Sequence, residues 1–135
     1  MQAAVLLQKL KILDWEIGER QKIAERYNSS FYDKFSIPCV RENCVSSYAQ
    51  YVLLADNRES RGKIIERLNF KKIANMVYYP TPMHRLKVFA GLNCYEEQFE
   101  NAESYCSRTF SLPMHPYLKP DEQDLIIAVV IDGGN

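Results

Sequence analysis

The sequence predicts a small α/β fold, in which a long N-terminal helix precedes a layer of two or three strands with helices on it. Three observations predict this class. Apolar residues recur at helical spacing near the N-terminus, two strand-type runs flank a helical run in the middle, and no internal repeat or second domain appears in the 135 residues. A chain of this length is about one domain and can bury a core of its own.

The first predicted element is a long amphipathic helix from Ala3 to Tyr27. Its apolar positions alternate in steps of three and four, with Arg20 as the one break: Ala3, Leu6, Leu10, Leu13, Ile17, Ala24 and Tyr27. A straight helix of this length would be about 35 to 40 Å long, and Gly18 is the expected place for a bend. The apolar seam either lies along its own domain or pairs with a further domain or a second subunit, and the pattern leaves both open.

The middle of the chain predicts a strand, a helix and a second strand. The run SSYAQYVLLA, from Ser46 to Ala55, is rich in aromatic and aliphatic residues and suits a central strand. Asn57 is an N-cap type of residue, and the helix that it opens continues from Arg58 to Leu68. The second strand is expected from Ile73 to Tyr79, where two prolines follow.

The C-terminal third predicts shorter elements. We expect short helices at 85–90 and 101–107 and a brief third strand from Phe110 to Leu112 that Pro113 stops. Pro120, followed by two acids, is typical of a helix start. This last helix is predicted to end at the glycine pair 133–134.

The candidate site is the turn after the second predicted strand. It brings two phenols, Tyr78 and Tyr79, within a few residues of His84 and Arg85, because the prolines of the segment 80–82 end the strand. Polar side-chain tips then converge at a strand end. The alternative is an ordinary surface turn whose tyrosines pack their rings and leave their hydroxyls in water.

Composition excludes several classes of function. Seventeen basic and seventeen acidic side chains cancel, so no general attraction to nucleic acid or to an anionic membrane is expected. Five glycines form no phosphate-binding loop, and no serine or cysteine lies in a nucleophile elbow. The four cysteines fit neither a zinc pattern nor a disulfide framework, and we interpret them as reduced thiols, mostly buried or incidental. The N-terminus resembles neither a signal peptide nor a membrane span, which predicts a cytoplasmic protein.

A family resemblance extends over essentially the whole chain. The phrases QAAVLLQKL, SSYAQYVLL, VYYPTPMH and SLPMHPYL occur in the same order as in the C-terminal third of the DegT-type, pyridoxal-phosphate-dependent sugar-nucleotide aminotransferases. The sequence departs from the family pattern at three points. Lys72, Ile73 and Ala74 replace a "GIP" phrase, Leu86 replaces a glutamine, and residues 99–103 replace "FP.AE".

The resemblance implies a fold and a division of the chain. The fold would be the small domain of fold-type I enzymes of this kind, an α+β arrangement with a mainly antiparallel sheet of two to four strands covered by helices. Residues 1–30 would form the long helix that links to an absent large domain, and residues 31–135 would form the C-terminal small domain.

The resemblance also implies binding residues but no catalytic ones. By matching position, Tyr78, Tyr79, Met83 and His84 would contact the sugar or its carboxylate at a dimer interface, with a UDP-linked 3-keto-hexuronic acid as the finer expectation. Pyridoxal phosphate belongs to the full-length family, whose Schiff-base lysine and phosphate cradle come from the large domain. No cofactor and no metal are therefore expected for this chain alone.

Three functions stay open on this sequence. The chain is a fragment that needs the large domain for catalysis, or a non-catalytic binding or assembly module that pairs through its N-terminal helix, or a remnant that folds incompletely and associates through exposed apolar surface. The expected partners are a sugar nucleotide, in the full-length enzyme, and either a second copy or a large domain.

Overall fold

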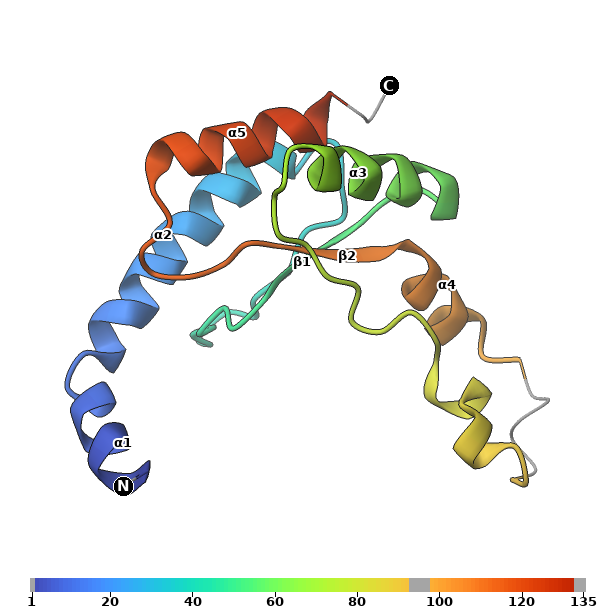
Figure 1. The fold of residues 1–135 in the computed structure, drawn as a ribbon, viewed down its shortest axis with the longest axis horizontal. Coiled ribbons are helices and arrows are strands. Elements are labelled where there is room, and N and C mark those ends of the chain that lie inside the picture. The colour runs from blue at the N-terminus through green and yellow to red at the C-terminus, as the bar shows by residue number, and fades with distance from the viewer. Residues whose placement is uncertain (1, 93–97, 133–135) are drawn as a thin grey trace.

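The computed structural model describes residues 2–92 and 98–132 of the chain. Helices dominate it, and the two strands are short (Figure 1). The elements in chain order are α1 (Gln2–Leu10), α2 (Leu13–Phe31), β1 (Tyr51–Leu54), α3 (Arg58–Phe70), the 3₁₀ turns η1 (Met83–Arg85) and η2 (Lys87–Phe89), α4 (Glu100–Arg108), β2 (Thr109–Leu112) and α5 (Pro120–Ile131).

The sheet consists of β1 and β2, paired antiparallel. Tyr51 lies opposite Leu112 and Leu53 lies opposite Phe110, so these four side chains share one face. All four are buried. The structure thus confirms the predicted small antiparallel sheet, including the brief strand that ends just before Pro113.

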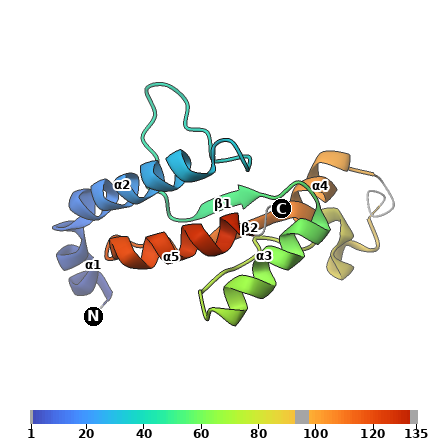
Figure 2. The ribbon, with the colours of Figure 1, turned by 90° about the horizontal axis from the view of Figure 1, so that it is seen from above.

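Helices α2, α3 and α5 cover the apolar face of this sheet (Figures 1 and 2). The core that they form with β1 and β2 contains the fully buried side chains Tyr27, Phe31, Tyr51, Leu53, Ile64, Leu68, Phe110 and Val130. As predicted, α3 follows an Asn57 cap, whose side-chain oxygen accepts a hydrogen bond from the Ser60 amide at 2.9 Å. Helix α5 begins at Pro120 as expected, while the predicted stop at 133–134 lies outside the described residues.

Several polar groups in the core form hydrogen bonds across elements. The Tyr51 hydroxyl donates to Asn28 Oδ1 at 2.7 Å, and the Tyr27 hydroxyl donates to the carbonyl of Pro113 at 3.1 Å. Burial raises the pKa of both phenols well above its usual range. The side chain of Gln123 in α5 donates to the Ile23 carbonyl of α2 at 2.8 Å, which joins two core helices.

The predicted single helix from Ala3 to Tyr27 is wrong in one respect, because the chain forms two helices with a turn at Lys11 and Ile12. The amides of these two residues bond to carbonyls three positions back, at 3.2 Å each, and this tight turn interrupts the α-helical ladder. Helix α2 runs through Gly18 without a break. A glycine inside a helix keeps its backbone hydrogen bonds and costs only about 1 kcal/mol relative to alanine.

The two predicted long strands are shorter than expected. The first, from Ser46 to Ala55, is reduced to β1 because Tyr48 adopts a positive φ of 43°, which interrupts an extended backbone. The second, from Ile73 to Tyr79, is reduced to one bridge between Met76 and Ser111.

Residues 73–79 do not pair with β2 on either side of that bridge, because β2 lacks free amide donors there. Hydrogen-bonded positions alternate along the strand, so the next one after Ser111 is Pro113, which has no amide hydrogen to donate. On the other side, the Thr109 amide already bonds to the Tyr105 carbonyl at the end of α4. The segment after Met76 is therefore free to leave the sheet.

The remaining predictions have mixed outcomes. The helix expected at 101–107 is confirmed as α4, and the one expected at 85–90 is replaced by η1 and η2. Of the cysteines, which we interpret as reduced thiols that are mostly buried or incidental, Cys39 and Cys44 are free and exposed and Cys106 is free and half-buried, while Cys94 lies outside the described residues. Within the part of the chain that the structure describes, no helix is long and apolar enough to cross a membrane.

Two arms extend from the core in Figure 1. The N-terminal arm, residues 2–15, contains α1, which has no buried residue. The site arm, residues 78–92 and 98–108, contains the turn at residues 80–82, which we call the proline turn, and η1, η2 and α4. Both arms carry large apolar side chains on their surface, including Val5, Leu6, Leu7, Leu10 and Trp15 on the first and Tyr79, Met83 and Val88 on the second.

Candidate functional site

The two tyrosines of the predicted site lie where the chain leaves the sheet after Met76. Tyr78 is 39% exposed and Tyr79 is 72% exposed, and their rings meet edge to face with centroids 5.9 Å apart. The planes of the two rings are inclined by 74° to each other.

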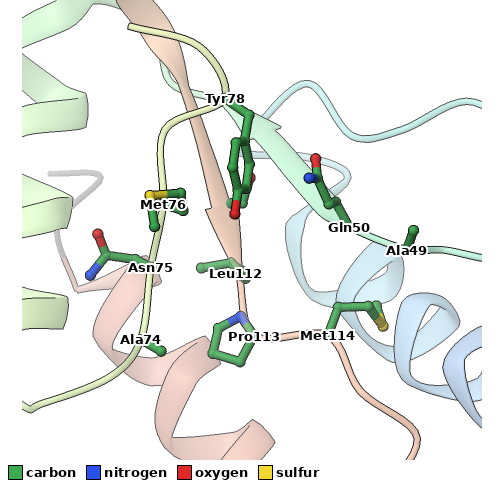
Figure 3. A pocket seen from close by; sticks show the side chains of 10 residues that line it. Ala49, Gln50, Ala74, Asn75, Met76, Tyr78, Leu112, Pro113 and Met114 are labelled. Carbon is green, nitrogen blue, oxygen red and sulfur yellow. The ribbon is translucent and has the colours of Figure 1, made fainter. Parts of the chain in front are cut away.

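Tyr78 lines a first cavity of about 260 Å³ on the sheet side of the turn. Its ring projects between Met76 on one side and Gln50 on the other, above Leu112 and Pro113 (Figure 3). Ser111 also lines this cavity, and its hydroxyl is buried without a hydrogen-bond partner in the described part of the chain. The cavity combines an apolar floor with a few hydrogen-bonding groups.

Tyr78 also lines a second, larger cavity of about 670 Å³, which separates the proline turn from α4. Tyr79 and Met83 line the same cavity, and Tyr105 of α4 lies across from them. The structure thus brings three of the four predicted contact residues to one cavity. Its walls are mainly apolar, with the hydroxyls of the tyrosines and of Thr81 as hydrogen-bonding groups, as is common for sites that bind small molecules.

His84 does not line either of these two cavities. Its side chain is only 9% exposed, and its Nε2 lies 3.1 Å from Glu103 Oε1 on α4. The ring also packs on Phe99, with centroids 4.7 Å apart. In this structure His84 therefore attaches the proline turn to α4.

Glu103 connects two residues of η1. Besides the contact with His84, its Oε1 accepts hydrogen bonds from Arg85 Nη2 at 3.2 Å and Arg85 Nε at 3.4 Å. The hydrogen bond with His84 is the largest cause that holds the pKa of the Glu103 carboxyl below its usual range; desolvation, the next in size, opposes it, and the hydrogen bonds and charge of Arg85 lower the pKa further. Glu103 is thus a carboxylate at neutral pH.

Sequence reasoning missed two residues that complete this region. Glu103 falls within the segment 99–103 that departs from the family phrase, and an acid in the first turn of the predicted helix 101–107 is a usable signal for a partner of His84 or Arg85. Tyr105, on the helix face next to the second cavity, gave no signal of its own. Its position depends on how α4 packs, which local sequence does not specify.

The arrangement supports binding more than bond-making chemistry. Phenol hydroxyls can donate to and accept from sugar hydroxyls, carbonyls and carboxylates, while rings and prolines exclude water. Within residues 2–92 and 98–132, no group of histidine, cysteine and acidic side chains is placed to hold a metal ion.

The residues of the two cavities do not fit pyridoxal phosphate. That cofactor needs a lysine amine for its carbonyl carbon, and neither cavity is lined by a lysine or by an acidic residue for the ring nitrogen. We therefore assign no cofactor-binding role to these residues.

The chain matches the DegT/DnrJ/EryC1/StrS aminotransferase family over residues 1–131. It is 34% identical over 131 residues to the UDP-2-acetamido-2-deoxy-3-oxo-D-glucuronate aminotransferase of Pseudomonas aeruginosa, an alignment that covers 96% of this chain and 35% of that enzyme. The chain thus spans about a third of the length of the curated relatives it matches.

Solved structures agree with this match. A DegT DnrJ EryC1 StrS aminotransferase from Brucella abortus has a TM-score of 0.82 at 36% identity, covering 99% of this chain and 35% of its own. DesV of S. venezuelae, solved in complex with a ketimine intermediate, has a TM-score of 0.89 at 27% identity, covering 100% of this chain and 36% of its own. The fold described above is that of one part of these larger enzymes.

Proposed function

Because this chain belongs to the DegT/DnrJ/EryC1/StrS aminotransferase family, we propose that it serves as the C-terminal small domain of an enzyme that aminates a keto-sugar nucleotide. The observation that carries the proposal is the cavity of about 670 Å³ that gathers Tyr78, Tyr79 and Met83 beside α4. A cavity with apolar walls and phenol hydroxyls suits a sugar, whose faces are apolar and whose edges carry hydroxyls.

The proposed contacts follow from this geometry. Tyr78 and Tyr79 donate hydrogen bonds to a hydroxyl, keto oxygen or carboxylate of the sugar, and Met83 covers an apolar face. For His84, which lines neither cavity, we propose an indirect role: its Nε2, 3.1 Å from Glu103 Oε1, holds in place the turn that carries the tyrosines. Tyr78, Tyr79 and Met83 bind and orient the substrate and keep water from it, and none of them is proposed as a catalyst.

The amino-transfer chemistry itself would come from pyridoxal phosphate when it is bound. We place that cofactor, and the lysine that forms its Schiff base, on a large domain outside this chain. Residues 1–30 would connect to that domain and residues 31–135 would form the small domain, with the last turns of α2 shared with its core. The exposed apolar residues of the N-terminal arm support this arrangement, since α1 buries none of them in the described structure.

The finer substrate is a UDP-linked 3-keto-hexuronic acid. Support comes from the P. aeruginosa relative, whose name states a UDP-linked 3-oxo-glucuronate substrate. A carboxylate on the sugar would also accept hydrogen bonds from phenol hydroxyls, and hydrogen bonds to a charged acceptor are stronger than neutral ones.

A second function is favoured by the same N-terminal arm. The exposed side chains of Leu6, Leu7 and Leu10 would also suit a non-catalytic assembly module that pairs through α1 with another copy. A chain that forms stable dimers but confers no activity on a large domain would favour this alternative.

The proposal is tested by a chimera. The C-terminal part of the P. aeruginosa aminotransferase that aligns with this chain is replaced by this chain, and amination of the UDP-linked 3-oxo sugar is measured. We expect activity from the chimera and none from the isolated host large domain. A chimera that folds and binds pyridoxal phosphate but does not aminate the sugar would contradict the proposal.

Tyrosine variants of the chimera then test the site. Tyr79→Phe removes one hydroxyl and should lower kcat/KM by about tenfold, the effect of one hydrogen bond to the substrate. Tyr32→Phe is the matched control, because Tyr32 is 71% exposed, close to the 72% of Tyr79, and lines neither cavity. Equal effects of both changes would exclude Tyr79 as a contact.

A further inference from the structure

A third cavity of about 350 Å³ adjoins the proline turn, and its lining differs from that of the two cavities that Tyr78 lines. It shares Pro80, Thr81, Pro82 and Cys106 with the 670 Å³ cavity, so the same turn bounds both spaces. We propose that this third cavity, the arginine cavity, binds a phosphate-type anion: a phosphate or diphosphate, free or as part of a nucleotide. This proposal does not rest on the proposed aminotransferase function.

Three separate positions bring guanidinium groups to the arginine cavity. Arg58 is the first residue of α3, Arg61 lies one turn further along the same helix, and Arg85 comes from η1. The N-terminal end of α3 lies beside α4 in both overall views (Figures 1 and 2). Glu103 of α4 holds Arg85 of η1, so the packing of α4 beside α3 brings the three arginines together.

Positive charge dominates this lining. Glu103 is the one acidic residue among the residues that line the cavity, against three arginines. Its Oε1 accepts hydrogen bonds from His84 as well as Arg85, so its charge is already engaged on the η1 side. A net positive charge in a concave space concentrates anions, and the N-terminal end of α3 adds a partial positive charge from its helix dipole.

The two arginines of α3 retain hydrogen-bonding capacity. Arg61 donates from Nη1 to the Cys106 carbonyl at 2.9 Å, and its Nε is buried without an acceptor in the part of the chain that the structure describes. Within the same part of the chain, Arg58 forms no ion pair. Arg61 is thus pre-positioned by one bond that leaves its Nη2 uninvolved, and Arg58 is available to an anion.

The ligand class follows from these donors. Guanidinium groups match the paired oxygens of phosphates, and the Arg58 and Arg61 groups on one helix suit an anion with several acceptor oxygens, while Arg85, which donates to Glu103, adds positive charge across the cavity. A monovalent carboxylate would engage fewer of them. We infer a dianionic phosphate or diphosphate as the ligand.

The experiment uses the full chain with inorganic phosphate, pyrophosphate and UDP as probes. Calorimetry gives the affinities, and NMR of the arginine Nε–Hε groups reports which side chains respond. Arg58→Gln and Arg61→Gln are each expected to weaken pyrophosphate binding about tenfold or more, as the loss of a charge-assisted hydrogen bond predicts. Arg41→Gln removes the same charge from an exposed residue that does not line the cavity, and should leave the affinity unchanged.

The outcomes separate a built site from general charge attraction. If Arg41→Gln weakens binding as much as Arg58→Gln, or if neither α3 variant weakens it, the proposal is wrong. Because Arg61 also holds the Cys106 carbonyl, circular dichroism monitors folding, and Arg58→Gln, which breaks no contact in the described structure, keeps the test decisive. Tighter binding of UDP than of pyrophosphate would identify a nucleotide as the source of the anion, and equal binding would identify the free anion.

Discussion

The core and the two arms of this molecule differ in how far their apolar side chains are buried. In the core, the side chains of α2, α3, α5 and the two strands bury one another, and Tyr27, Leu53 and Phe110 have no exposed surface. In the N-terminal arm, Val5, Leu6 and Leu7 are about 60% exposed. The core is complete by itself, whereas the arms present apolar surface of the kind that a partner covers.

Because of this difference, the residues that stabilise the fold are not the residues that line the proposed binding cavities. The residues that hold the fold together are fully buried and chemically inert, while the cavity of about 670 Å³ lies on the site arm and the arginine cavity lies between that arm and the first turn of α3. The proposed binding surfaces therefore depend on a few local attachments, such as Glu103 with His84 and Arg85, in addition to the position of α3.

The largest contrast is expected from truncating leucines in the two regions. Leu53→Ala should lower the free energy of unfolding by about 3 kcal/mol, because it removes a fully buried side chain and leaves a cavity. Leu6→Ala should change it by less than about 0.5 kcal/mol, since Leu6 is 60% exposed. Chemical denaturation followed by circular dichroism measures both. Similar losses would mean that the N-terminal arm packs as part of the core.

A smaller effect is expected at the polar bond between α2 and α5. Gln123→Ala removes the donor to the Ile23 carbonyl and leaves that acceptor without its partner in a buried place. The loss should be about 1 to 2 kcal/mol in the same denaturation experiment. As control, Asp121→Ala shortens an exposed side chain of α5, so a comparable loss there would show that the loss of the buried bond is not responsible.

On the site arm the expected effect is local and depends on pH. The pKa of Glu103 lies below its ordinary value of 4.5, so its bonds to His84 and Arg85 stabilise the arm above that pH and are lost as the pH falls below it. The protection factors of the η1 amides, which compare the measured exchange with the intrinsic rate at each pH, should therefore fall at acid pH in the natural chain. Glu103→Gln should show low protection already at pH 7 and no acid transition, and an unchanged profile would exclude this attachment.

The smallest predicted change is a gain in stability. Gly18 lies inside α2, and a Cβ added there meets no atom within 4 Å. Gly18→Ala should therefore stabilise the chain by about 0.5 to 1 kcal/mol through the better helix propensity of alanine. A loss would indicate that the helix bends at Gly18 in solution.

The sequence predicted the parts of this fold that depend on local signals. The helix after Asn57, the helix that starts at Pro120 and the strand stopped by Pro113 are where the residue types indicate. It failed where tertiary context decides. The run from Ile73 to Tyr79 has strand-type residues, but Pro113 and the engaged amide of Thr109 remove the backbone donors it would need.

The site was predictable in part for the same reason. The proline turn after Tyr79 is a local signal, and it does place Tyr78, Tyr79 and Met83 at one cavity. The direction of His84 was not predictable, because it depends on Glu103, nineteen positions later on α4. The arginine cavity likewise combines α3 with η1, which are distant in sequence.

The central claim is that this chain supplies binding surfaces while the Schiff-base lysine lies outside it. The most direct test is to incubate the pure chain, and separately the chimera, with pyridoxal phosphate, reduce with borohydride and locate lysine adducts by mass spectrometry. We expect no stoichiometric adduct on the chain alone, and in the chimera one adduct on a lysine of the large domain. A single stoichiometric adduct on a lysine of this chain would contradict the claim and give the chain a cofactor site of its own.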